Sequence, residues 1–144
     1  MQETVTISAP AEKVFTRVTD PERWRSYIPG LVKAAGFSWS DLRPGTSFSW
    51  EWGVAGAATL SGNGQVTQNV PNALFAVQVE GKISFTARCT FTPTPSGTDL
   101  LVEVDYRSAR DTLGEGFVAT IVHGVKSGVM HAIMGKIRAA CESP

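Results

Sequence analysis

Apolar and polar residues alternate along most of the chain between residues 31 and 108, and short turn sequences interrupt the alternation. This period of two predicts β-strands, because successive side chains of a strand point to opposite faces of a sheet. An earlier alternating run at residues 4–8 predicts a first strand. Short turns join the later runs, so they predict an antiparallel meander. The later runs cover residues 46–52, 59–70, 74–80, 83–92 and 98–108.

The run at residues 59–70 contains Gly62-Asn63-Gly64, which allows two interpretations. Asn-Gly is a strong hairpin signal, so the chain could reverse its direction there. Glycines inside a strand also mark a bulge or the close approach of another group. We prefer one long strand with a bulge or a close approach at the glycines.

Two short helices are predicted between the first strand and the meander. Pro10 at a first helical position, followed by the acidic Glu12, is typical of a helix start. Asp20 followed by Pro21 marks a second start, because the Asp20 carboxylate can accept hydrogen bonds from free backbone N–H groups. Pro29-Gly30 then ends the second helix.

The last segment, about residues 111–141, is predicted to form a long helix with one apolar stripe. Its glycines are unusual, since each disfavours a helix interior by up to ~1 kcal/mol relative to alanine. Packing against the sheet must therefore hold this helix. The stripe consists of Val118, Ile121, Val122, Val125, Val129 and Ile133, and the glycines are Gly114, Gly116, Gly124, Gly128 and Gly135.

Strand phase divides the predicted sheet into one apolar face and one polar face. An apolar face of this size must be buried, and the C-terminal helix is the one long apolar helix in the sequence. We therefore predict an α+β fold in which a curved antiparallel sheet of about seven strands surrounds that helix and leaves an apolar cavity. The apolar face carries Phe48, Trp50, Trp52, Phe75, Val77, Val79, Ile83, Phe85, Ala87, Cys89, Phe91, Leu100, Val102, Val104 and Tyr106.

Length and charge narrow the range of functions. The 144 residues fit one domain, residues 1–144. Thirteen basic and 13 acidic residues give a formal net charge of zero, which argues against a nucleic-acid partner. Low net charge makes self-association easier, so we expect a monomer or a homodimer. The sequence shows no signal peptide and no apolar run of ~20 residues, so we expect a cytoplasmic protein without a membrane span.

Four short motifs occur in a chain predicted to run strand, two short helices, six strands and long helix. They are Ile7-Ser8-Ala9-Pro10-Ala11-Glu12-Lys13-Val14-Phe15, Asp20-Pro21-Glu22-Arg23-Trp24, Pro44-Gly45-Thr46, and Phe91-Thr92-Pro93 before Ser96-Gly97-Thr98. The pattern resembles the START-like helix-grip (SRPBCC) superfamily, in particular its polyketide cyclase/dehydratase branch, over nearly the whole chain. The resemblance implies a ligand cavity between the sheet and the C-terminal helix. It transfers no catalytic residue, because the superfamily has no common one.

The candidate ligand-binding residues form an aromatic and apolar wall. Trp50 and Trp52 either stack on a planar ligand or serve as core packing, since indoles bury large areas. Gln68 shares the apolar face and could orient a ligand. Cys89 on the same face is expected to be an inert buried thiol. The full predicted wall is Phe48, Trp50, Trp52, Gln68, Phe75, Phe85, Cys89, Phe91, Phe117, Ile121 and Val125.

Three residues are candidates for proton transfer. Tyr106 shares the apolar face and could donate to a carbonyl group, or it could be a strand-end tyrosine that reaches solvent. His123 lies at the edge of the helix stripe and could act as a general base or acid near neutral pH, although the pattern favours a histidine that is simply solvated. Glu115 could lie at the cavity mouth or only favour the helix N-terminus. The spacing of histidines and cysteines predicts no metal site, and no cofactor fingerprint is present.

The sequence thus supports three hypotheses. The partner is an apolar or aromatic small molecule in the first two and a protein in the third. In the first, an enzyme of the cyclase/dehydratase type folds a reactive chain in the cavity and promotes ring closure or loss of water. In the second, a non-catalytic carrier, sensor or sequestering protein holds an apolar ligand. In the third, the domain is an interaction module similar to the co-chaperones of the superfamily. We place the first ahead of the second and the third last.

Overall fold

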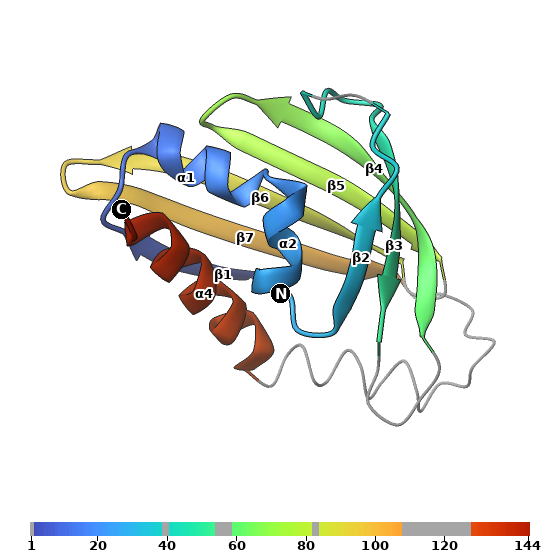
Figure 1. Ribbon diagram of the computed structural model, residues 1–144. Helices are drawn as coiled ribbons and strands as arrows, with labels where there is room; N and C mark the ends of the chain where they lie inside the picture. Colours follow the sequence, from blue (N-terminus) through green and yellow to red (C-terminus); the bar gives the residue numbers. More distant parts are fainter. Residues whose placement is uncertain (1, 39–40, 54–58, 82–83, 108–127) are drawn as a thin grey trace.

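The computed structural model describes residues 2–38, 41–53, 59–81, 84–107 and 128–144, with backbone alone at residues 106–107. Its seven strands form one sheet in the order β1-β7-β6-β5-β4-β3-β2, and each neighbouring pair is antiparallel (Figure 1). The strands are β1 Gln2–Ile7, β2 Leu31–Ala35, β3 Ser47–Trp52, β4 Leu60–Val70, β5 Leu74–Gly81, β6 Ser84–Thr94 and β7 Gly97–Arg107. This topology confirms the predicted antiparallel meander, which β1 extends at one edge.

Strand β4 runs through Gly62-Asn63-Gly64 without turning. Gly62 lies opposite Trp50 and Gly64 lies opposite Phe48 in the ladder with β3. The hairpin interpretation is therefore wrong, and the close approach of another group at the glycines is confirmed. The irregularity of this strand lies further on, between Val66 and Gln68 in the ladder with β5.

That irregularity removes Gln68 from the apolar face. Val66 is fully buried, and strict alternation would place Gln68 on the same side. The register shift between them reverses the phase, so Gln68 is exposed and lies opposite Ala76. The prediction that Gln68 shares the apolar face is wrong for this reason.

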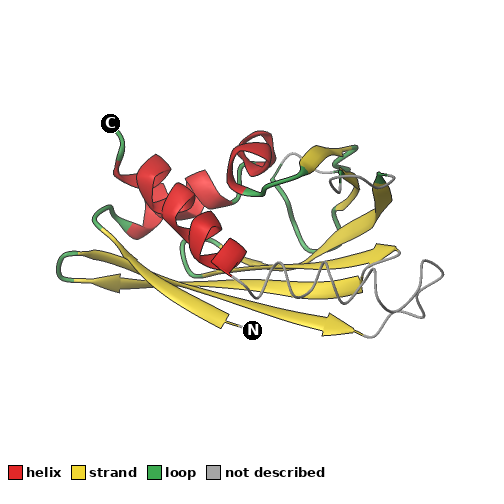
Figure 2. Cartoon of the chain, turned by 90° about the horizontal axis from the view of Figure 1, so that it is seen from below, coloured by secondary structure: helices red, strands yellow, loops and turns green. Residues whose placement is uncertain are grey.

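The described helices lie on one side of the sheet (Figure 2). They are α1 Ala11–Val18, α2 Pro21–Tyr27 and α4 Met130–Glu142. Helix α1 begins one residue later than predicted, since Pro10 has extended backbone angles and precedes the first helical residue. The predicted start of α2 is confirmed, because the Asp20 side chain accepts a hydrogen bond from the Glu22 backbone N–H at 3.1 Å.

The main core lies where α1 and α4 pack on β1, β6 and β7. Ile7, Val14, Leu100 and Met134 are buried there with at most 1% of their surface exposed. Each such side chain stabilises the fold by about 1.5–3 kcal/mol relative to an exposed one. A second cluster at the other end of the sheet consists of Phe48, Trp50, Leu60 and Val79. The aromatic and apolar residues that pack against both clusters include Trp24, Phe37, Val77 and Phe85.

The end of α4 is tied to the beginning of the chain. The Ser8 backbone N–H donates to Glu142 Oε2 at 2.9 Å, and Lys13 Nζ donates to the Ser143 carbonyl oxygen at 2.6 Å. Gly128, before this helix, has a left-handed φ of 105°. The α+β class, the curved antiparallel sheet and the C-terminal helix are therefore confirmed, while the predicted helical residues 111–127 lie outside the described residues.

A stability prediction concerns the exposed Gly135 in the interior of α4. A methyl group added there would meet nothing within 4 Å beyond the helix's own backbone. We expect Gly135→Ala to raise the free energy of unfolding by ~0.5–1 kcal/mol, because alanine loses less backbone entropy in a helix. Urea denaturation of both proteins measures the difference. A lower free energy of unfolding in the variant would contradict this description of α4.

A second prediction concerns pH. The Ser8 backbone N–H, with a smaller effect of Arg138, holds the pKa of Glu142 below its ordinary value. A depressed folded-state pKa stabilises the fold above the ordinary pKa, and this contribution disappears as the pH falls through the folded-state pKa. We therefore expect Glu142→Gln to be less stable than the wild type at neutral pH and equally stable in acid.

Thermal unfolding across a pH series measures this dependence. Glu51→Gln, on the outer face of β3, removes an equal charge away from the junction and serves as control. A stability difference for Glu142→Gln that stays constant into strong acid would show that the carboxylate does not hold this junction.

Candidate functional site

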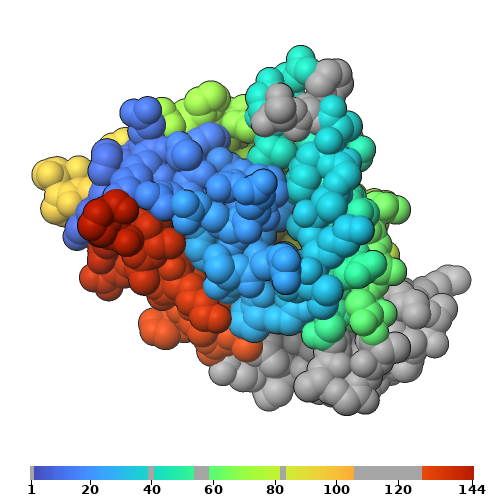
Figure 3. Space-filling view, in the orientation of Figure 1, coloured from blue at the N-terminus to red at the C-terminus, as the bar shows by residue number. Residues whose placement is uncertain are grey.

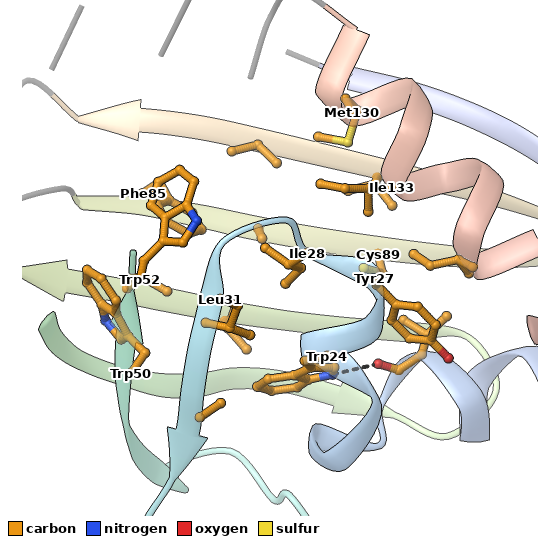
Figure 4. A pocket seen from close by; sticks show the side chains of 18 of the residues that line it. Trp24, Tyr27, Ile28, Leu31, Trp50, Trp52, Phe85, Cys89, Met130 and Ile133 are labelled. Carbon is orange, nitrogen blue, oxygen red and sulfur yellow. Dashed lines mark hydrogen bonds between the residues drawn. The ribbon is translucent and has the colours of Figure 1, made fainter. Parts of the chain in front are cut away.

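A cavity of about 260 Å³ lies between the helix-bearing face of the sheet, α2, the start of β2 and α4 (Figure 4). The space-filling view shows a small hollow between α2 and the segment that leads into β2 (Figure 3). Aromatic lining residues are Trp24, Tyr27, Phe48, Trp50, Trp52, Phe75 and Phe85, and the lining from α4 and the residue before it is Val129, Met130, Ile133 and Ile137.

Tryptophan N–H groups are the main polar groups on the described lining, and each is already hydrogen-bonded. Trp24 Nε1 donates to the Val18 carbonyl oxygen at 2.9 Å. Trp50 Nε1 donates to the Asn63 carbonyl oxygen at 3.1 Å. Trp52 Nε1 donates to the Pro29 carbonyl oxygen at 2.7 Å. The indoles therefore present apolar ring surface to the cavity, since their one donor each is used by the chain.

Tyr27 is the lining tyrosine, and its hydroxyl also has a partner on the chain. It donates to the Arg17 carbonyl oxygen at 3.1 Å, and burial raises the pKa of Tyr27. The phenol therefore stays protonated at neutral pH and is held by α1.

The Trp24 side chain packs α2 against aromatic residues of β3 and β5. Its ring lies edge-on to Phe37 and Phe48, with centroids 5.7 Å away in both cases, and 6.4 Å from Phe75. The Asp20 cap fixes the start of the helix that carries this side chain. Aromatic pairs at such distances stabilise by about 0.5–1.5 kcal/mol beyond the area they bury. This cluster therefore closes one wall of the cavity.

Trp52 fastens the turn between α2 and β2 to the end of β3. The Trp52 indole N–H donates to the Pro29 carbonyl oxygen, as described above. The next residue, Gly53, donates its backbone N–H to the Gly30 carbonyl oxygen at 2.8 Å. Gly30 has a left-handed φ of 83°, and a Cβ there would collide with the Trp52 indole. Glycine is therefore needed at this position for the rim of the cavity to close.

Cys89 contributes the one thiol of the lining among the described residues. It is half-buried on β6 and faces the cavity, and burial raises the pKa of Cys89 to about 12. The thiol is therefore protonated at neutral pH, and a protonated thiol is a poor nucleophile.

The structure brings six of the predicted wall residues together on the cavity: Phe48, Trp50, Trp52, Phe75, Phe85 and Cys89. Phe91 is buried elsewhere, where its ring packs edge-on against Phe15 with centroids 5.2 Å apart. Gln68 is exposed, as described above. Tyr106 lies opposite Phe85 in the β6–β7 ladder, with only its backbone described. The remaining predicted residues, Glu115, Phe117, Ile121, His123 and Val125, lie outside the described residues.

The predicted wall lacked the contribution of α2 and the turn after it. Trp24, Tyr27, Ile28 and Leu31 all line the cavity. The apolar face of the short helix was a visible signal, because an amphipathic helix beside a one-sided sheet must pack on its apolar face. Met130 and Ile137 were also missed, although they belong to the buried side of α4.

Neither a metal cluster nor a membrane-spanning helix occurs in the described part of the chain. Within the described ranges, no group of three or more His, Cys, Asp or Glu residues is arranged to hold a metal ion. No helix in that same part of the chain has the length and apolar character needed to cross a membrane.

Solved structures with the same fold come from several bacteria. TTHA0849 from Thermus thermophilus has a TM-score of 0.77 at 15% identity, with 98% of this chain and 95% of that chain covered. CV1439 from Chromobacterium violaceum has a TM-score of 0.75 at 18% identity, with 100% and 97% covered. The di-domain ARO/CYC StfQ from the steffimycin biosynthetic pathway has a TM-score of 0.76 at 15% identity, with 99% of this chain and 50% of StfQ covered. At these identities the likeness shows the fold.

Sequence comparison identifies the family. No curated protein matches the chain significantly. Residues 1–142 match the family described as polyketide cyclase / dehydrase and lipid transport, which confirms the resemblance found in the sequence. Because this match covers nearly the whole chain, the protein belongs to the polyketide cyclase / dehydrase and lipid transport family.

Proposed function

We propose that the protein binds a hydrophobic small molecule in the cavity and promotes its cyclisation or dehydration while it is held there. The apolar cavity with its hydrogen-bonded indoles carries this proposal. Membership of the polyketide cyclase / dehydrase and lipid transport family supports it, as does the structural likeness to the ARO/CYC StfQ.

The described lining favours an uncharged ligand. No Asp, Glu, Lys or Arg side chain belongs to that lining. Moving a charged group into such surroundings costs several kcal/mol unless a partner compensates it. The indole rings of Trp24, Trp50 and Trp52 offer large flat surfaces, which suit planar rings or conjugated chains.

Catalysis in such a cavity would rest mainly on positioning. In an aldol closure, an enol carbon of the bound chain attacks a carbonyl carbon of the same chain. One C–C bond forms, and the enol proton ends on the new alkoxide oxygen. Dehydration then breaks the C–O bond of the new hydroxyl group and a C–H bond on the neighbouring carbon, so a C=C bond forms and one water molecule leaves. Holding the chain bent with the two carbons about 3–3.5 Å apart removes much of the entropic barrier.

Proton transfer is proposed for residues outside the described lining. Cys89 and Tyr27 remain protonated at neutral pH, and the Tyr27 hydroxyl is bound to Arg17. Tyr106, opposite Phe85, is proposed as a donor to the carbonyl oxygen. His123 is proposed as general base or acid, since histidine titrates near neutral pH, and Glu115 as an assisting carboxylate.

The binding half of the proposal is tested with the neutral fluorophore N-phenyl-1-naphthylamine. Three of the four tryptophans line the cavity, so probe binding should quench the intrinsic fluorescence. We expect Ala87→Phe to weaken probe binding by at least about tenfold, because the added ring fills the cavity.

Ala132→Phe makes the same change at an exposed position of α4 and is the matched control. We expect this control to bind the probe as the wild type does. A wild type that does not bind the probe, or equal affinities in all three proteins, would refute the cavity as the binding site.

The catalytic half is tested by turnover of synthetic linear poly-β-ketone thioesters. General acid–base catalysis contributes about 100-fold to 10,000-fold, so we expect Tyr106→Phe or His123→Ala to slow ring closure by about 100-fold or more. Glu115→Gln is expected to have a smaller effect. Affinity for the fluorophore, measured in parallel, shows that each variant remains folded.

Unchanged rates in all three variants would refute the proposed proton-transfer roles. A wild type that binds the thioesters and does not accelerate their closure or dehydration would refute catalysis and leave a carrier.

A further inference from the structure

Two neighbouring aromatic residues of the cavity wall each lie opposite a glycine. Phe48 pairs with Gly64 and Trp50 pairs with Gly62 in the β3–β4 ladder. Gly62 in turn lies opposite Gly81 on β5. Directly paired residues share a face, so the glycines leave a bare strip of backbone beside the two rings.

Both rings occupy this strip. A Cβ at Gly64 would fall within 2.8 Å of three atoms of the Phe48 ring. A Cβ at Gly62 would fall within 2.9 Å of two atoms of the Trp50 indole, and one at Gly81 would lie 3.2 Å from the same ring. Real Cβ atoms do not approach other atoms as closely as a Cβ at Gly64 or Gly62 would approach these rings. The rings therefore lie flat across β4 in space that any side chain would fill.

Trp50 is also held in its plane. Its Nε1 donates to the carbonyl oxygen of Asn63, the residue between the two glycines, at 3.1 Å. The indole is 7% exposed and lines the cavity. Backbone below the ring and a hydrogen bond at its edge fix its orientation before any ligand arrives, which reduces the entropy lost on binding.

We propose that Gly62 and Gly64 are specificity-determining residues of the cavity. They let Trp50 and Phe48 lie flat against β4, and thereby set the depth of the cavity and give it a rigid planar wall. The ligand class that fits is a planar, uncharged, multi-ring or conjugated molecule. This inference rests on the proposed binding function, because it assumes that the ligand occupies this cavity.

Gly64 is the better position for a test. A Cβ at Gly62 would also collide with the Glu80 backbone oxygen, so a substitution there disturbs the pairing of β4 with β5. At Gly64 the three nearest atoms all belong to the Phe48 ring. That ring is stacked on Phe37 with centroids 5.1 Å apart and touches Trp24, so a displaced ring takes up cavity space.

The test uses two neutral probes of different size, naphthalene and pyrene, titrated against intrinsic tryptophan fluorescence. We expect Gly64→Ala to weaken pyrene binding by at least about tenfold and to change naphthalene binding by less than about threefold, because overpacking removes space that only the larger probe needs. Gly135→Ala makes the same substitution at an open, exposed position and should change neither affinity.

Two further variants complete the test. The double variant Phe48→Leu with Gly64→Ala should recover pyrene binding, because the shorter side chain leaves room for the methyl group. Phe48→Leu alone should shift the ratio of the two affinities toward pyrene. This variant tests the role of the Phe48–Gly64 contact if Gly64→Ala does not fold.

The outcomes distinguish the proposed binding function from the proposed role of the glycines. A wild type that binds neither probe overturns the proposed function and this inference with it. A wild type that binds pyrene, together with unchanged pyrene affinity in Gly64→Ala or an unchanged affinity ratio in Phe48→Leu, overturns the role of the glycines alone.

Discussion

Burial of one apolar face of the sheet is the interaction on which the rest of the structure depends. Helices α1 and α4 cover this face at the β1, β6 and β7 end of the seven-stranded sheet. The other end is covered by its own aromatic residues and by α2, through the ring of Trp24. Exposed apolar surface costs about 25 cal/mol per Å², so the chain curves its sheet toward the helices rather than leaving that face in water. The cavity is the space that this arrangement does not fill with side chains.

The chemistry of the cavity follows from how its few polar groups are used. Each lining indole donates its N–H to a backbone carbonyl, and the Tyr27 hydroxyl donates to Arg17. These bonds remove the cost of burying donors and at the same time fix the rings in place. A ligand therefore meets rigid, flat, apolar walls. Such walls can position a reactive chain, but they offer few groups for acid–base chemistry. Proton transfer is proposed for Tyr106, His123 and Glu115, none of which contributes a described side chain to these walls.

The sequence predicted the faces of the strands and their antiparallel order, but it did not predict the register in which they pair. Alternation placed Phe48, Trp50, Phe75 and Phe85 on the cavity side, because side-chain direction depends only on local backbone geometry. Gln68 was misplaced because one register shift reverses the phase of every later residue in its strand. The contact of Phe48 with Gly64 depends on the register of two strands, which the alternation of either strand does not contain. The Asp20 cap was predicted since its signal is local, whereas the role of Trp24 on the cavity wall needed the packing of α2.

The central claim is that this fold holds an uncharged apolar molecule in a preformed cavity. Native mass spectrometry of protein purified without added ligand tests it most directly. We expect a fraction of the protein to carry one small molecule that is lost on mild activation, is recovered in an apolar solvent extract and bears no charged group. Protein found only at its own mass, with an empty extract and no shift on incubation with pyrene, would contradict the claim, as would a bound molecule that carries a phosphate or a carboxylate.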